Sequence, residues 1–227
     1  MNNYSIKDLI GTISSHSGLY GLFANPGFGT TTLSMQIARS VADMSGGTAI
    51  IFTMELPKEQ WCKRIQDIGL LADRLLVVDE FCPTDQMIED TIKNTENVRL
   101  VVIDYLELLD ESISQKLRGI AKQCSIPIFV CGKLARNSGD FDPNNRPELL
   151  TIGSMFESPF GSRQLVRFKD FDFLSLLHRD HDCERGIGIA HRYNISNTTE
   201  LIIKDHPRGK VGSIFIEWDE QRKCFDI

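Results

Sequence analysis

A glycine-rich loop between an apolar run and a helix-forming segment is the first place in this sequence where chemistry could occur. It consists of Asn25, Pro26, Gly27, Phe28, Gly29, Thr30, Thr31 and Thr32. A strand, a tight loop and a helix N-terminus together place backbone amides around a phosphate group. Gly29 and Thr31 match the pattern G-x-x-x-x-G-K-[ST], but Thr30 stands where the lysine should be. On the pattern alone, the loop fits a phosphate site and a plain turn equally well.

Two acidic residues that follow other apolar runs favour the phosphate site. Glu55 comes directly after Thr48–Met54, and Asp104 follows Leu100–Ile103. In a parallel sheet, the carboxyl ends of the strands form the ligand-binding edge, so both carboxylates are expected beside the loop. Asp104 has the position of an aspartate on the magnesium side of a nucleoside triphosphate. The three features in this order therefore predict a nucleotide site.

Short apolar runs and segments of helical period alternate in the first half of the chain. The expected strands are Leu19–Ala24, Thr48–Met54, Leu75–Val78, Leu100–Ile103 and Ile126–Cys131. The expected helices are Ser5–Ser14, Thr31–Asp43, Pro57–Leu71, one capped by Thr84, and Glu111–Cys124. Wholly apolar strands that alternate with helices predict an α/β fold with a mostly parallel central sheet flanked by helices.

The last part of the chain has a different pattern. Asn137–Arg146 is rich in turn formers and Leu150–Lys169 has no regular period, so both are expected to be exposed loops. Strand-like runs return at Phe171–Leu177, Thr199–Lys204 and Ser213–Trp218. Little sequence separates these runs, so they predict a hairpin-rich extension of the same sheet.

Composition limits the class of protein. Of 227 residues, 41% are hydrophobic and 25% are charged, with a formal net charge of −6, which is typical of a globular chain. No stretch approaches the ~18–20 apolar residues of a membrane span, and no secretory signal is visible. We therefore expect a cytoplasmic protein with no membrane partner and six reduced cysteines.

The segment His178–Cys183 contains residue types that bind metals. It is a single cluster without a second pair to complete a tetrahedral set, so a strand end that runs into a polar loop is the preferred interpretation. The acidic charge argues against a nucleic-acid coat, which usually shows a basic footprint. It leaves room for a localised basic channel.

Five segments carry a family resemblance across nearly the whole chain. They are GLFANPGFGTTTLSMQIA, IIFTMELPKEQWCKRI, LVVIDYLELL, ISQKLRGIAKQCSIPIFVCGKLAR and TELIIKDHPRGKVGSIFI. In this order they resemble the C-terminal, RecA-like motor domain of the DnaB family of replicative helicases. The resemblance implies a P-loop NTPase fold, ATP and Mg²⁺ as cofactors, single-stranded DNA as a partner and a hexameric ring. We expect residues 1–227 to form one such domain, without the amino-terminal helical domain of full-length relatives.

The resemblance also implies roles for individual residues. Glu55 would polarise the attacking water, Thr31 and Asp104 would hold Mg²⁺, and the backbone of Gly27–Thr31 would wrap the phosphates. The family loop typically begins with alanine, so Ala24 is no departure, but Thr30 would be the lysine that reaches the β- and γ-phosphates. One charge-assisted hydrogen bond is worth about 1.5–3 kcal/mol, so its loss weakens nucleotide binding roughly 10- to 150-fold.

A second departure is Lys133, which stands where the family has a polar sensor, usually glutamine. Its strand is expected between the loop strand and the strand of Asp104, so Lys133 would emerge near the γ-phosphate. One hypothesis is that Lys133 partly replaces the missing lysine. The alternative is that it lies on a solvated rim or pairs with Glu107, itself standing where the family usually has glutamine.

A third departure precedes the G-x-x-G turn Gly209–Gly212. Family members carry a lysine and an arginine there, which reach the neighbouring subunit's site. Asp205 and Pro207 occupy those positions here. Lys204 and Arg208 lie one residue away, a shift that turns a strand side chain to the other face. Arg208 is the candidate for contact with the nucleotide.

In the family, DNA is contacted by loops that face the channel of the ring. The corresponding segments here are Asn137–Arg146 and Ser158–Lys169. The candidate DNA-binding residues in or next to these segments are Arg136, Arg146, Arg163 and Arg167. Basic residues in loops also serve simply as a solvated surface, so both interpretations stay open.

Three functions are compatible with these residues. The first is a DnaB-like ATPase that translocates on single-stranded DNA, with a weak or inactive catalytic site. The second is a non-hydrolysing relative that acts as a binding or regulatory partner of a replication, phage or mobile-element assembly. The third, another RecA-type ATPase of the recombinase or clock-protein sort, fits the DYLELL and PKEQ segments less well.

Overall fold

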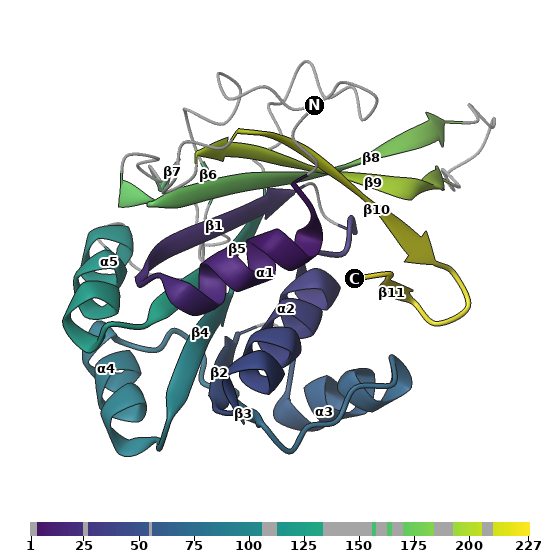
Figure 1. Cartoon of the computed structure of the whole chain (residues 1–227). Helices are drawn as coiled ribbons and strands as arrows, with labels where there is room; N and C mark the ends of the chain where they lie inside the picture. Colours follow the sequence, from purple (N-terminus) through teal and green to yellow (C-terminus); the bar gives the residue numbers. More distant parts are fainter. Residues whose placement is uncertain are drawn as a thin grey trace.

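A nine-stranded sheet with helices on both faces forms the frame of the molecule (Figure 1). The computed structural model describes residues 4–24, 27–54, 56–105, 113–133, 156–157, 163–164, 170–183, 193–205 and 211–227. Its helices are α1 (Ile6–Ser15), α2 (Thr30–Ser45), α3 (Lys58–Asp67), α4 (Asp85–Asn94) and α5 (Ile113–Cys124). The strands of the large sheet are β1 (Gly18–Ala24), β2 (Thr48–Thr53), β3 (Leu75–Val78), β4 (Val98–Asp104), β5 (Pro127–Lys133), β8 (Phe173–Cys183), β9 (Tyr193–Asp205), β10 (Gly212–Asp219) and β11 (Cys224–Phe225).

The sheet has a parallel part and an antiparallel part. Its order is β11-β10-β9-β8-β1-β5-β4-β2-β3. Neighbours from β8 to β3 run parallel, whereas β9, β10 and β11 add to β8 in antiparallel pairs. The α/β fold, the mostly parallel sheet and its hairpin-rich extension are therefore confirmed.

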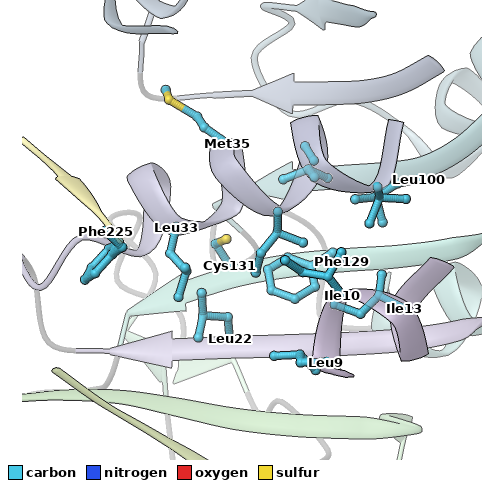
Figure 2. Packing of buried hydrophobic residues seen from close by; sticks show 14 of the residues in the cluster. Leu9, Ile10, Ile13, Leu22, Leu33, Met35, Leu100, Phe129, Cys131 and Phe225 are labelled. Atoms are coloured by element: carbon cyan, nitrogen blue, oxygen red, sulfur yellow. The ribbon is translucent and has the colours of Figure 1, made fainter. Parts of the chain in front are cut away.

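Two apolar cores lie on the two faces of the sheet. On one face, α1, α2 and α3 pack against alternate strand residues such as Leu22 and Phe129, as Figure 2 shows for α1 and α2. On the other face, Ile88 of α4 and Leu117 of α5 pack against the remaining strand residues. Because both faces are covered, every residue of β1 is buried, which explains its uninterrupted apolar sequence.

Helix starts follow local sequence signals. Ser5 begins α1 with a reciprocal capping box, in which its hydroxyl accepts from the Asp8 amide and the Asp8 carboxylate accepts from the Ser5 amide. Thr84 caps α4 as predicted, since its Oγ1 accepts from the Met87 amide at 3.1 Å. Such side-chain caps satisfy amides that have no partner within the helix.

Two expectations about loops are corrected. The segment His178–Cys183 is itself strand rather than the start of a loop, because β8 continues through Cys183 and pairs there with Tyr193 of β9. No group of three metal-ligand side chains gathers among the described residues. Within Leu150–Lys169, two short strands, β6 (Phe156–Glu157) and β7 (Arg163–Gln164), form an antiparallel pair where only loop was expected. Residues 137–146 lie outside the described ranges.

Five of the six cysteines have described side chains, and all five are free thiols. No disulfide joins the cysteines whose side chains are described. Cys131 and Cys224 are buried, whereas Cys62, Cys82 and Cys124 are half-buried. In the described part of the chain, no helix is long and apolar enough to cross a membrane.

The last strand is fastened to α2 by a pair of buried hydrogen bonds. The Phe225 amide donates to Gln36 Oε1 at 2.9 Å, and Gln36 Nε2 donates to the Phe225 carbonyl oxygen at 2.7 Å. The Phe225 ring also packs edge-on against Trp218 of β10, with ring centroids 4.9 Å apart. The C-terminal strand therefore closes over the helix that begins at the glycine-rich loop.

Replacing Gln36 with alanine should strongly destabilise the protein. Gln36→Ala leaves a buried donor and a buried acceptor of Phe225 unsatisfied, so we expect the free energy of unfolding to fall by about 2–4 kcal/mol. Urea denaturation would measure this. Gln86→Ala, which removes one exposed side-chain bond to Asp90, is the matched control and should cost less than about 0.5 kcal/mol. Equal losses in the two variants would contradict the fastening role.

Candidate nucleotide-binding site

The carboxyl ends of three adjacent parallel strands bring predicted site residues together. Ala24 ends β1 just before the loop, Lys133 ends β5, and Asp104 ends β4. Ala24 pairs in register with Lys133, and Asp104 pairs with Cys131, so all of them lie at one edge. The predicted position of β5 between β1 and β4 is confirmed. This edge is where open α/β sheets bind ligands.

The strand that precedes Glu55 is not adjacent to the loop strand. Two strands lie between β2 and β1, and β2 instead borders β4. Thr53 pairs in register with Asp104, and the Met54 amide donates to the Asp104 carbonyl oxygen at 2.9 Å. Glu55 itself lies outside the described residues, so its contact with the loop stays a prediction.

The loop leaves the N-terminus of α2 without a side-chain cap. Gly27 and Gly29 have φ angles of 88° and 97°, a left-handed conformation that glycine adopts without steric cost. Gly29 is the N-cap of α2, and as a glycine it offers no side chain to the first-turn amides. The first turn also contains no acidic residue. Amides at such a helix start attract phosphate groups.

Aromatic side chains pack against the loop. A Cβ atom on Gly29 would lie 2.9 Å from Phe225 Cζ and 3.6 Å from Trp218 Cζ3, so only glycine fits against the C-terminal strand. Phe28 is buried, with its ring centroid 6.3 Å from that of His178. The loop is thus positioned by residues from the last third of the chain.

Thr31 and Asp104 meet as the family resemblance implied. Thr31 Oγ1 donates to Asp104 Oδ2 at 3.0 Å, and Asp104 is only 1% exposed. The Tyr105 hydroxyl lies 3.5 Å from Thr31 Oγ1. A carboxylate and a hydroxyl are hard oxygen ligands, and they sit beside amides suited to phosphate. The residues therefore fit Mg²⁺ with a nucleoside phosphate.

Lys133 directs its ammonium toward this group. Its Nζ lies 4.0 Å from the centroid of the Tyr105 ring, a cation–π contact. Thr30, which replaces the loop lysine, is 8% exposed, and its hydroxyl side chain carries no charge. Glu107, the alternative partner of Lys133, lies outside the described residues.

Sequence reasoning missed a second cation beside the loop. Arg64 Nη2 donates to Thr32 Oγ1 at 2.9 Å, which brings a guanidinium from α3 to the first turn of α2. Arg64 stands three residues after the buried Trp61 and so lies on the same helix face. That spacing was the available signal.

A buried arginine near the C-terminal strand was also missed. Arg179 of β8 is 3% exposed, and its guanidinium carbon lies 4.9 Å from the Trp218 ring centroid. Burial lowers the pKa of Arg179, and the Glu220 carboxylate opposes that effect. The preceding residue, His178, is also buried, with its ring near that of Phe28.

Several predicted site residues cannot be placed. Those outside the described residues are Asn25, Pro26, Glu55, Glu107, Arg136, Arg146, Arg167 and Arg208. Arg163 belongs to β7, but its side chain is not described. The predicted G-x-x-G turn lies between β9 and β10, which pair in antiparallel fashion.

The parallel sheet, the loop before α2 and the Thr31–Asp104 pair define a RecA-like P-loop fold. Residues 71–226 match the family of DnaB-like helicase C-terminal domains. The chain belongs to this family. It is 23% identical over 261 residues to the replicative DNA helicase DnaB of Haemophilus influenzae, covering 92% of this chain and 51% of that protein. It is 29% identical over 152 residues to DnaB of Mycoplasma pneumoniae, covering 60% and 30%.

Solved structures show the same fold. One of them, an ATPase domain, superposes with a TM-score of 0.70 at 20% identity, covering 92% of this chain and 84% of that one. A structure of a DnaB-like replicative helicase and its interactions with primase superposes with a TM-score of 0.69 at 19% identity. The match covers 94% of this chain and 57% of that one. The chain spans about half the length of full helicase relatives such as that of Haemophilus influenzae.

Alanine at the two loop glycines should separate backbone strain from steric clash. Gly27→Ala meets nothing within 4 Å, so we expect it to cost only the left-handed backbone penalty of about 1–2 kcal/mol in unfolding free energy. Gly29→Ala adds a clash with Phe225 and should cost about 2–4 kcal/mol. Chemical denaturation of both variants would measure the difference. A Gly29→Ala variant as stable as Gly27→Ala would show that the Phe225 contact is not constraining.

Proposed function

We propose that this chain is the ATP-binding motor domain of a DnaB-type replicative helicase, with hydrolysis slowed by its altered cations. The observation that carries the proposal is the buried hydrogen bond between Thr31 and Asp104 at the N-terminus of α2, which has no side-chain cap. Family membership supports ATP as the nucleotide. The donor set supports Mg²⁺ as its counterion.

The proposed roles of the site residues combine the family resemblance with the described geometry. The amides of Gly27–Thr31 would hold the β- and γ-phosphates, and Thr31 and Asp104 would hold Mg²⁺. Mg²⁺ held there would neutralise charge that develops on the phosphates in the transition state. Glu55 would orient the attacking water and accept its proton. Arg64, bonded to Thr32, adds positive charge at the same helix start.

Lys133 is proposed to supply the charge that the loop has lost. It ends β5, level with Ala24 of the loop strand, and its ammonium lies over Tyr105. From this edge the side chain would reach the γ-phosphate and so partly replace a lysine at position 30. Glu107 would then be a catalytic neighbour of Lys133 rather than an ion-pair partner that neutralises its charge.

Slow hydrolysis is proposed because cationic elements change together. Thr30 offers no charge, and Asp205 and Pro207 stand where family members have a lysine and an arginine that reach the neighbouring subunit's site. A trans arginine is worth about 1000- to 100000-fold in turnover. Arg208 is the remaining candidate for that contact. If nucleotide binding is absent, the chain would instead serve as a binding or regulatory partner of a helicase assembly.

Assembly and DNA binding are further proposals based on the family. The family resemblance implies a hexameric ring that encloses single-stranded DNA, and the matched relatives are replicative DNA helicases. We propose a cytoplasmic location for this assembly. The basic residues proposed to contact the strand are Arg136, Arg146, Arg163 and Arg167. The salt dependence of single-strand binding would test them, since each neutralised phosphate contact adds to its slope.

Calorimetric titration with Mg²⁺ and a slowly hydrolysed ATP analogue is the direct test. We expect micromolar binding to the unmutated protein, weakened roughly 10- to 150-fold by Lys133→Ala because one charge-assisted hydrogen bond is lost. Lys122→Ala, which removes an exposed lysine of α5, is the matched control and should bind normally. Absence of binding to the unmutated protein would sink the ATPase proposal and favour the partner role.

Restoring the loop lysine should raise hydrolysis. In Thr30→Lys, a cation returns to the start of α2, and we expect steady-state ATPase activity to rise by about 100-fold, the lower end of what a lost transition-state donor costs. Adding Asp104→Asn should abolish the gain, because the carboxylate that is proposed to hold Mg²⁺ is then missing. An unchanged rate in Thr30→Lys would show that the defect extends beyond this side chain.

A further inference from the structure

We infer that Tyr105 is a positioning residue that holds the Lys133 ammonium beside the predicted magnesium ligands. This inference rests on the proposed function, in which Lys133 contacts a phosphate. It adds a second residue to the altered site. The Tyr105 ring would restrain a lysine that reaches the site from β5 rather than from the loop. Neither the loop pattern nor the Asp104 position suggested a role for this tyrosine.

Tyr105 contacts both sides of the site. It follows Asp104 directly and is 9% exposed. The face of its ring lies beneath Lys133, with Nζ 4.0 Å from the centroid. Its hydroxyl lies 3.5 Å from Thr31 Oγ1, which itself donates to Asp104. One side chain therefore links the cation from β5 with a hydroxyl from α2.

An aromatic ring suits this task for two physical reasons. A lysine side chain has many rotamers. When a half-buried lysine at a strand end occupies rotamers that point away from a phosphate, its affinity for that phosphate falls. The ring face restricts these rotamers through cation–π attraction. Unlike a carboxylate, the ring carries no net charge, so this contact does not cancel the positive charge that a phosphate requires.

Two tyrosine variants separate the ring from the hydroxyl. Tyr105→Phe keeps the ring, and Tyr105→Leu removes it while keeping an apolar side chain. Affinity for Mg²⁺ with a slowly hydrolysed ATP analogue should fall about 3- to 10-fold in Tyr105→Leu and less than about 2-fold in Tyr105→Phe. In a Lys133→Met background, Tyr105→Leu should have no additional effect.

A measurement without nucleotide tests the contact itself. The NMR signals of the Lys133 ε-methylene, assigned by their loss in Lys133→Met, should be shifted upfield by the ring current of Tyr105. The shift should persist in Tyr105→Phe and vanish in Tyr105→Leu. The unmutated protein alone tests this point if Tyr105→Leu does not fold, and an unshifted Lys133 signal would overturn the inference.

The outcomes distinguish this inference from the proposed function. If Lys133→Met weakens binding but Tyr105→Leu does not, the inference is wrong and the proposed function stands. If Tyr105→Leu weakens binding equally in both backgrounds, Tyr105 has only a structural role and the inference is overturned. If the unmutated protein binds no nucleotide, the proposed function fails. The nucleotide-free NMR signal then decides the inference separately: an upfield shift supports the Lys133–Tyr105 contact, and an unshifted signal overturns it.

Discussion

The left-handed turn at Gly29 is the constraint on which the site depends. It begins α2 without a side-chain cap on the first amides, and it is possible only because no Cβ separates the loop from the Phe225 ring. Gln36 in turn fixes the Phe225 backbone to α2. The geometry of a loop near the start of the chain is therefore determined by its last residues, through hydrogen bonds that span 189 positions.

Charge around this turn is distributed differently from a loop that carries its own lysine. A lysine at position 30 would leave from the first residue of α2, so its position would be set by the loop alone. Lys133 and Arg64 approach from β5 and α3, and each depends on a neighbour, Tyr105 or Thr32, for its orientation. A low local dielectric strengthens the attraction between such cations and a phosphate, but only when the positions of the cations are fixed.

Local sequence signals predicted the frame of this fold well. The strand Leu75–Val78 was predicted with its observed limits, and the Thr84 cap was predicted from one residue type. Both depend on short-range patterns, an apolar run and a helix-capping hydroxyl. The extension of β8 through Cys183 was missed because its pairing with β9 involves polar residues, which leave no apolar run to read.

The candidate site was predictable only where a motif reports it. Thr31 and Asp104 follow from a loop pattern and a strand end, and the structure brings them into contact. The Arg64–Thr32 bond and the Phe225 contact join segments distant in sequence, so spacing within one segment does not identify the partner residue. Tertiary packing decides which side chains reach a motif from other elements, and in this chain we propose that those side chains make up for the missing lysine.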